Sequence, residues 1–392
     1  MSTNSPVQLV AWSAFASMAA MRICDPMLVD LGRTFGVTTG EAAQVITAYM
    51  VAYGVLQLFY GPLGDRLGKL RVIWLATFAC GVLSLVTAAA PNLLSLVAAR
   101  AAMGAAAAGI IPLSVAWVGD QVPYAQRQEA LARLMGATVM GMMVGQWFGG
   151  WATEHWGWRY GLAGLAVLFA MAVWRMHRSL QQLPAFVPPT EHMPWVQYWQ
   201  ATARLWTQPR VRWVLTMTFA EGALVMGTVA FMPSRLVDLG LSVSQAGTAM
   251  VLYGACGLAY SQLAKVSLAR WGEQGLARGG GALVALGLLS LSLAPGPGWA
   301  VLACPLAGWG FYMMHNTLQT QATQMAPEAR SMAVTLFACT LFLGQTAGVA
   351  LVALCLDAGG LQAALGIAAG AVLLLGLFMA KGLQPKTLLS PP

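Results

Sequence analysis

The feature that most constrains the fold is a succession of long apolar stretches separated by short polar loops. A helix rises about 1.5 Å per residue, so roughly 20 apolar residues cross the ~30 Å hydrocarbon core of a bilayer. Backbone groups in hydrocarbon must be satisfied internally, and no stretch alternates like a barrel strand, so each is predicted to be helical. Twelve such segments are predicted, near residues 7–31, 41–62, 71–90, 93–118, 130–152, 160–177, 212–236, 246–268, 279–295, 299–323, 332–354 and 361–381.

The composition argues against a soluble domain and against a nucleic-acid-binding protein. Only 9% of the residues are charged and 58% are hydrophobic, whereas a soluble protein carries roughly 25% charged residues. The net charge of +8 is spread over short loops and forms no basic helix face, so the expected partner is the lipid bilayer and not nucleic acid. The six cysteines fall singly inside apolar segments, so neither a disulfide framework nor a metal site is expected.

The distribution of basic residues among the loops predicts the orientation. Most lysines and arginines lie in loops on one side of the predicted segments, and the other side holds Arg33, Arg159 and Arg235. By the positive-inside rule, both chain termini are expected in the cytoplasm, with the protein in the cell inner (plasma) membrane.

The chain repeats itself at an offset of 204 residues. The organisation predicted from this repeat is an N-terminal six-helix half over residues 1–177 and a C-terminal six-helix half over 212–392, with a substrate site between them. The fold class is therefore all-α, a polytopic membrane protein with two pseudo-symmetric halves. The offset pairs Gly36 with Gly240, Tyr49 with Tyr253, Arg66 with Arg270, Gly68 with Gly272 and Gly104 with Gly308.

Residues 178–211 form the predicted cytoplasmic linker between the halves. Three prolines interrupt it, Pro184, Pro188 and Pro189. An aromatic stripe then recurs at helical spacing, through Trp195, Tyr198, Trp199, Thr202 and Trp206. The stripe fits an interfacial helix in the headgroup region, and it fits equally well a linker that packs under the helix ends.

A glycine-punctuated charged loop, Gly61-Pro62-Leu63-Gly64-Asp65-Arg66-Leu67-Gly68-Lys69-Leu70-Arg71, joins the second and third segments. Glycines let two helix ends approach and turn, and the charges hold the loop in water. The loop resembles the signature G-x-L-a-D-[RK]-x-G-[RK]-[RK] between helices 2 and 3 of the major facilitator superfamily, with Leu70 replacing a basic residue. The resemblance implies the major facilitator fold and transport by alternating access.

The same resemblance implies a role for this loop. In the family it latches the two halves in the outward-facing state, with its aspartate facing the N-terminus of helix 11. The second copy, Ala269-Arg270-Trp271-Gly272, lacks the aspartate. The implied conformational latch comprises Gly61, Asp65, Arg66, Gly68 and Arg71, with Arg127 of the helix 4–5 loop as their partner.

Charged residues inside the predicted segments are the candidates for coupling, because a centred charge costs about 2.5–3.5 kcal/mol. Arg22 and Asp25 stand one helical turn apart and are expected to pair, either for coupling or as a self-neutralised structural pair. Glu221 has no charged neighbour in the sequence. It is expected to bind a proton reversibly, to stay protonated, or to pair with an arginine across the cavity. Arg100 is expected to face the protein interior.

Three of these regions resemble motifs of drug:proton antiporters within the superfamily. Cys24-Asp25-Pro26 falls where those proteins have an acidic residue followed shortly by proline, so the resemblance makes Asp25 the first candidate for the proton-binding carboxylate. Leu96-x-x-x-Arg100-x-x-Met103-Gly104 resembles the helix 4 motif L-x-x-x-R-x-x-q-G, whose arginine is thought to tune a neighbouring carboxylate. Helix 5 resembles G-x-x-x-G-P-x-x-G-G, with Gln146 in place of the proline.

Polar residues inside the segments are the candidates for the substrate cavity. His315, Asn316 and Gln319 share one helix face, and the histidine either carries protons or makes a neutral hydrogen bond. The two glutamines of helices 5 and 11 either contact substrate or join helices. The predicted cavity residues are Tyr49, Tyr53, Gln57, Gln146, Tyr253, His315, Asn316, Gln319 and Gln345.

The sequence thus predicts a secondary active transporter, most like the bacterial twelve-helix drug:proton antiporter or efflux-permease branch. The predicted activity is proton-coupled export of small organic, amphipathic or drug-like molecules, and the alternative is proton-coupled uptake or exchange of a sugar, organic acid or other metabolite. No metalloprotease or nucleotide-binding motif is present, so an intramembrane enzyme ranks below both. The expected partners are a small-molecule substrate, protons and the bilayer, with a proton gradient in place of any cofactor and a monomer as the working unit.

Overall fold

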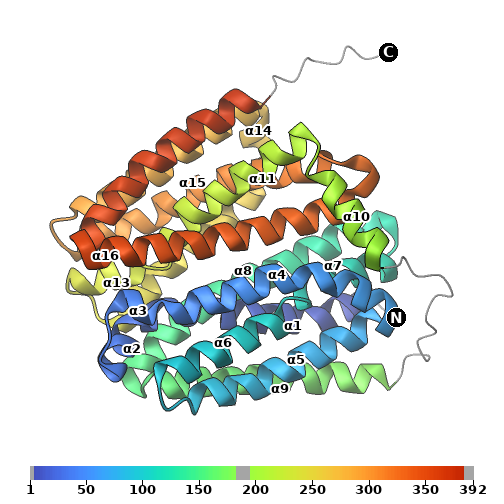
Figure 1. The fold of residues 1–392 in the computed structure, drawn as a ribbon, viewed down its shortest axis with the longest axis horizontal. Coiled ribbons are helices and arrows are strands. Elements are labelled where there is room, and N and C mark those ends of the chain that lie inside the picture. Colours follow the sequence, from blue (N-terminus) through green and yellow to red (C-terminus); the bar gives the residue numbers. More distant parts are fainter. Residues whose placement is uncertain (1–3, 182–194, 384–392) are drawn as a thin grey trace.

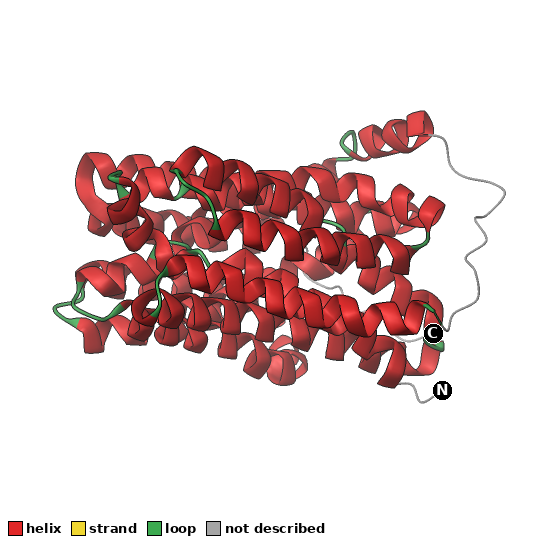
Figure 2. Ribbon diagram, turned by 90° about the horizontal axis from the view of Figure 1, so that it is seen from below, coloured by secondary structure: helices red, strands yellow, loops and turns green. Residues whose placement is uncertain are grey.

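The computed structural model describes residues 4–181 and 195–383 of the chain. Within these residues every regular element is a helix and no strand occurs, as Figure 2 shows. The all-α fold class predicted from the apolar stretches is therefore confirmed. Figure 1 shows two layers of helices, with those of the first half of the sequence below and those of the second half above. Helix α1 begins, and helix α16 ends, at the same end of the bundle.

The helices of the first half are α1 (Asn4–Arg22), η1 (Asp25–Met27), α2 (Leu28–Phe35), α3 (Thr39–Ala42), α4 (Gln44–Leu67), α5 (Lys69–Ala88), α6 (Leu93–Ala107), α7 (Ile110–Gln121), α8 (Tyr124–His155) and α9 (Trp158–Leu180). Helix α10 (Trp195–Leu205) follows on its own. The second half comprises α11 (Pro209–Glu221), the π-helix η2 (Gly222–Met226), α12 (Gly227–Val229), α13 (Met232–Asp238), α14 (Val243–Leu293), α15 (Pro297–Gln324), η3 (Pro327–Ala329) and α16 (Arg330–Gly382). The domain boundaries at 177 and 212 stay a prediction.

Nine helical segments of the described residues are both long and apolar enough to cross a membrane. One of them, Val243–Leu293, contains the non-helical residue Gly272 (φ 63°, ψ 175°), where two helices meet at a turn. Helices α8 and α15, with 32 and 28 residues, are also long enough to cross, although they carry more polar residues. This arrangement is consistent with the twelve segments predicted.

The backbone repeats the same turns in both halves. All glycines of the described residues that have a positive φ form three pairs offset by 203 or 204 positions: Gly36 with Gly240, Gly68 with Gly272, and Gly157 with Gly360. A positive φ is a conformation that glycine adopts without steric cost, so these turns explain why the glycines recur. Capping boxes also recur at the offset, Thr38 with Glu41 and Ser242 with Gln245.

Helix crossings repeat as well, and small residues make them possible. A Cβ added to Gly145 of α8 would overlap the carbonyl oxygen of Ala19 in α1, and one added to Gly348 of α16 would overlap that of Ala223 in η2. Without a side chain, two helices approach until their backbones touch, which is how transmembrane helices gain dispersion contacts. The crossing of α8 on α1 thus has its counterpart in the crossing of α16 on η2.

The two layers contact each other through α8 with α14 and α4 with α16. At one seam, an added Cβ on Gly247 of α14 would lie 2.6 Å from the carbonyl oxygen of Gln146 in α8. At the same seam, the backbone N–H of Ser244 donates to the Glu154 carboxylate over 2.7 Å. Hydrogen bonds from Ser242 and Ser244 hold the pKa of Glu154 below its ordinary value. At the other seam, the rings of Tyr53 and Phe342 meet edge to face with centroids 4.7 Å apart.

Helix α10 lies at the end of the bundle where α1 begins, alongside the ends of α4 and α16 (Figure 1). The Tyr198 hydroxyl donates to the carbonyl of Leu58 over 3.1 Å, and the Trp199 and Phe59 rings meet edge to face. Thr202 is buried and donates to the Met332 sulfur of α16. Burial and, secondarily, the negative charge of Asp65 raise the pKa of Tyr198. These contacts favour a linker that packs under the helix ends; Pro184, Pro188 and Pro189 lie outside the described residues.

Candidate functional site

The first buried charged pair lies where α1 is interrupted. Pro26 has no N–H to give to an α-helix, so α1 ends at Arg22 and a short 3₁₀ turn begins at Asp25. Arg22 Nη1 lies 3.3 Å from Asp25 Oδ2, and the two side chains are 5% and 0% exposed. The predicted pairing of these two residues is therefore confirmed. Gln146 of α8 donates a hydrogen bond to the same Oδ2 over 3.2 Å, so the glutamine that replaces the motif proline orients the carboxylate.

Arg22 also contacts the other half of the protein. Its second nitrogen, Nη2, lies 3.0 Å from the sulfur of Met226, which ends the π-helix η2. Thioether sulfur is a weak acceptor, so this contact holds the guanidinium only loosely on that side. Met226 stands 204 residues after Arg22, which makes it the repeat counterpart of the arginine.

Arg100 of α6 is completely buried and is held by backbone groups. Its Nη1 donates to the carbonyl of Ala20 over 2.9 Å, and its Nε donates to the carbonyl of Val45 over 3.4 Å. Ala20 lies in the last turn of α1, where carbonyls lack intrahelical donors. The guanidinium also lies over the ring of Tyr49, 4.2 Å from its centroid, in a cation–π contact. Arg100 therefore joins α1, α4 and α6.

The second buried pair lies between α11 and α15. Glu221 is fully buried at the point where α11 widens into the π-helix, a distortion that is frequent at functional sites. Its Oε2 lies 3.0 Å from Nδ1 of His315. The histidine side chain is 17% exposed, and its ring stacks on Phe311 with centroids 5.0 Å apart. Sequence reasoning named both residues but missed their pairing.

Several hydrogen-bonding atoms of the site have no protein partner among the described residues. They are Asp25 Oδ1, Glu221 Oε1, Arg100 Nη2, Gln345 Nε2 and the hydroxyls of Tyr49 and Tyr253. Buried polar groups are normally paired, so a cluster of free donors and acceptors marks a place where a proton, water or ligand group is accommodated. The free atoms come from both halves of the chain.

The remaining candidates for the cavity differ in burial. Tyr53 and Gln57 are both 2% exposed, and Gln57 donates to the carbonyl of Gly54 within its own helix. Asn316 is partly buried and Gln319 is exposed, so the face that they share with His315 runs from the interior outward. Their predicted role in binding substrate stays a prediction.

The charged segment of residues 61–71, predicted to be a loop, is helical except at Gly68, because α4 continues to Leu67 and α5 begins at Lys69. Its ion pairs include residues that were not predicted. Asp65 pairs with Lys69 at 3.4 Å, and Lys69 reaches Asp120 at the end of α7 at 2.7 Å. Arg127 donates to the carbonyl of Val122. Sequence reasoning did not predict Lys69 as the bridge. Gly68 has φ 92°, as the tight turn at this loop requires, and the latch role of the loop stays a prediction.

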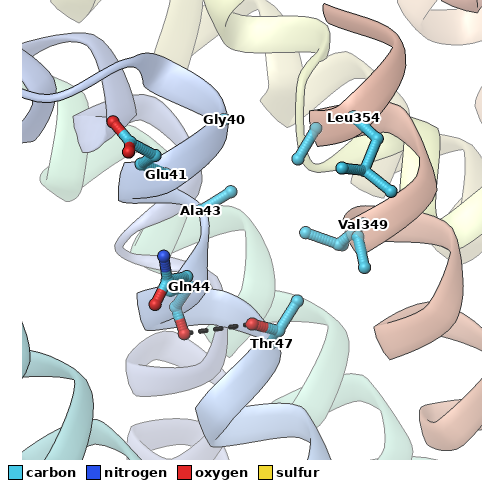
Figure 3. Close-up of a pocket in the computed structure, with 9 residues that line it drawn as sticks. Gly40, Glu41, Ala43, Gln44, Thr47, Val349 and Leu354 are labelled. Carbon is cyan, nitrogen blue, oxygen red and sulfur yellow. Dashed lines mark hydrogen bonds between the residues drawn. The ribbon is translucent and has the colours of Figure 1, made fainter. Parts of the chain in front are cut away.

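A groove of about 270 Å³ lies between α3–α4 and α16, as Figure 3 shows. Its first wall carries the polar side chains Glu41, Gln44 and Thr47, and its second wall is apolar, with Val349 and Leu354. None of the buried charged residues described above lines it. The groove is therefore separate from the candidate coupling site.

A helical membrane bundle with a duplicated backbone and charged pairs buried in its interior has the features of a membrane carrier. The comparisons with known proteins identify the family. Residues 10–332 match the profile described as Major Facilitator Superfamily, and the chain belongs to this superfamily. It is accordingly a multi-pass membrane transporter and not an enzyme.

The sequence identities to individual members of the superfamily are low. The chain is 31% identical to Multidrug resistance protein D of Escherichia coli over 190 residues, which are 48% of this chain and 48% of that protein. It is 26% identical to the Gallate transporter of Pseudomonas putida over 345 residues, or 79% of this chain and 74% of the relative. Among solved structures, a mutant of nucleoside transporter NupG superposes with TM-score 0.77 at 14% identity, covering 96% and 98% of the two chains. That likeness concerns the fold alone.

Proposed function

We propose that this protein is a proton-coupled exporter of small organic, amphipathic molecules in the cell inner membrane, with both termini in the cytoplasm. It works as a monomer by alternating access, exchanging protons for substrate without a cofactor. The observation that carries the proposal is a buried ion pair at the junction of the two halves: Arg22 pairs with Asp25 in the first half and contacts the Met226 sulfur in the second. Intramembrane charges that bridge two halves suit a device that links proton binding to movement of the halves.

Two further observations support the direction and the substrate class. The similarity to Multidrug resistance protein D covers about half of the chain and favours an exporter. The walls around the site are mostly aromatic and aliphatic, including Tyr49, Phe311 and Phe337, which suits molecules with a large apolar part.

A second candidate function is proton-coupled uptake of an organic acid. The observation in its favour is the similarity to the Gallate transporter, which extends over 79% of the chain. Two buried arginines, Arg22 and Arg100, would suit a carboxylate substrate.

Transport by purified protein in liposomes with an imposed pH gradient distinguishes the two functions. The probes are ethidium, an amphipathic cation, and gallate, and the control is the same liposomes without protein. We expect ethidium to move against the proton flux and to accumulate beyond equilibrium until a protonophore collapses the gradient. Accumulation of gallate in the direction of the proton flux, without ethidium movement, would refute export and support uptake.

A further inference from the structure

We propose that the transported proton is bound by the Glu221–His315 pair of the second half, whereas the Arg22–Asp25 pair of the first half stays ionised throughout. The inference rests on the proposed proton coupling and names the site that performs it. It departs from the sequence resemblance, which points to Asp25.

The two pairs differ in their basic residue, which is Arg22 in one pair and His315 in the other. Arginine does not lose its proton in proteins, whereas histidine exchanges one near neutral pH. A proton added to Asp25 would leave the guanidinium of Arg22, only 5% exposed, without a counter-charge. Asp25 also accepts the hydrogen bond of Gln146 through the oxygen that faces Arg22, and this bond favours the ionised carboxylate against the opposing effect of complete burial.

The Glu221–His315 pair has no such constraint, because a carboxylate and an imidazole can each gain or lose a proton. With one proton between them, the pair is neutral overall, either as carboxylate with imidazolium or as carboxylic acid with imidazole. A second proton makes the pair cationic, and loss of the first makes it anionic. Glu221 Oε1 has no hydrogen-bond partner among the described residues and can take a proton. Asp25 Oδ1 is equally without a partner, so the two carboxylates are distinguished by their basic partners.

The exposure of the two side chains suggests the route. Glu221 is fully buried, whereas His315 is 17% exposed and shares a helix face with Asn316, which is partly buried, and Gln319, which is exposed. A proton that reaches the imidazole through Nε2 can be passed on through Nδ1, which lies 3.0 Å from Glu221 Oε2. The histidine then relays protons and the carboxylate stores them.

Most groups around the Glu221–His315 pair are uncharged, so the charge of the pair itself changes the local electrostatic field most. From α14 the titratable neighbour is Tyr253, which lies near the charges of both Arg22 and Glu221, and Cys256 lies next to that tyrosine. From α15 itself comes Tyr312, and α16 contributes the ring of Phe337, which does not titrate. Phenols and thiols ionise above neutral pH in water, so they remain neutral here. From α1, Arg22 is a permanent charge that acts on Tyr253, as Glu221 also does.

Arg22 can transmit a change in the charge of the Glu221–His315 pair to the first half of the protein. Its Nη2 touches Met226, five residues beyond Glu221 along the π-helix. When the pair becomes anionic it attracts the guanidinium toward η2, and when it becomes cationic it repels the guanidinium toward Asp25. In a low-dielectric interior such a change of sign acts over several ångströms.

Infrared difference spectroscopy with pH steps tests the assignment without a substrate. The samples are wild type, Glu221→Gln, His315→Gln and the charge-neutral double variant Arg22→Gln/Asp25→Asn, each in liposomes. Glu154→Gln serves as a control, because it removes a carboxylate outside the site. We expect wild type to show a carboxylic-acid band that titrates with pH. A component of this band should be absent in Glu221→Gln, should titrate at a different pH in His315→Gln, and should persist in the double variant.

A band component that persists in Glu221→Gln and disappears in the double variant would overturn the proposal, as would a wild type without any buried titrating carboxyl component. A parallel transport measurement distinguishes failure of this proposal from failure of the proposed function. Glu221→Gln should lose ethidium accumulation driven by the pH gradient while retaining ethidium exchange at equal pH. If wild type transports neither probe, the proposed function fails, and the infrared assignment is still decided on its own.

Discussion

The ion pair between Arg22 and Asp25 makes a quantitative prediction through a double-mutant cycle. Removing one partner of a buried pair costs about 3–5 kcal/mol, because the other charge is left uncompensated. In Arg22→Gln the carboxylate keeps the hydrogen bond from Gln146, so we expect the lower end, about 3 kcal/mol. In Asp25→Asn the guanidinium keeps the weak sulfur contact to Met226 and faces an amide, so we expect about 4 kcal/mol.

The double variant Arg22→Gln/Asp25→Asn carries no charge at either position and retains polar groups that can bond to each other and to Gln146. We expect it to lose only about 2 kcal/mol of the free energy of unfolding, since replacing both members of a buried pair is far less costly than removing one. The free energies come from unfolding in mixed detergent micelles, with retained helicity by circular dichroism as the check on folding. Single effects that add to the double effect within about 0.5 kcal/mol would show that the pair is not coupled, and the reasoning would fail.

Three further predictions follow from single contacts. Gly145→Ala places a methyl group against the backbone of α1 and should lower the free energy of unfolding by about 1–3 kcal/mol. The added methyl group of Gly136→Ala, on the same helix, meets no atom within 4 Å, so this variant should raise the free energy of unfolding by about 0.5–1 kcal/mol. Thermal unfolding compares the two variants, and equal shifts in melting temperature would contradict this contrast. Tyr198→Phe removes the hydrogen bond to Leu58 and should speed amide hydrogen exchange in α10, without changing exchange in α1. Met226→Leu leaves Arg22 Nη2 without its acceptor and should cost about 1 kcal/mol, a loss that should vanish in an Arg22→Gln background.

The sequence predicts those features of the fold that depend on short-range patterns. The helices that cross the membrane are predicted by the length of the apolar stretches. The turns at Gly36 and Gly240 are predicted by residues that recur at a fixed offset. The Arg22–Asp25 pair was predictable because residues three apart share a helix face. Each of these signals is contained in a single segment or in a comparison of one segment with its copy.

The long-range partners of Glu221 and Lys69 depend on how helices pack. His315 lies 94 positions after Glu221, and Asp120 lies 51 positions after Lys69, so spacing carries no information on either contact. One physical signal was nevertheless present for the first pair. Glu221 was the carboxylate of one apolar segment and His315 the histidine of another in the same half, and burying either alone is costly.

The repeat also explains why the two halves are suited to different tasks. Duplication has kept the glycine turns and the helix crossings of the backbone, but not the buried charges. At the offset of 204 residues, Arg22 corresponds to Met226 and Glu221 corresponds to Ser17, so each half has a charged pair where the other has none. A residue that touches its own repeat counterpart, as Arg22 touches Met226, must lie close to the axis that relates the two copies. The Arg22–Met226 contact is thus a direct link between the charged pair of the first half and the π-helix that follows Glu221 in the second half.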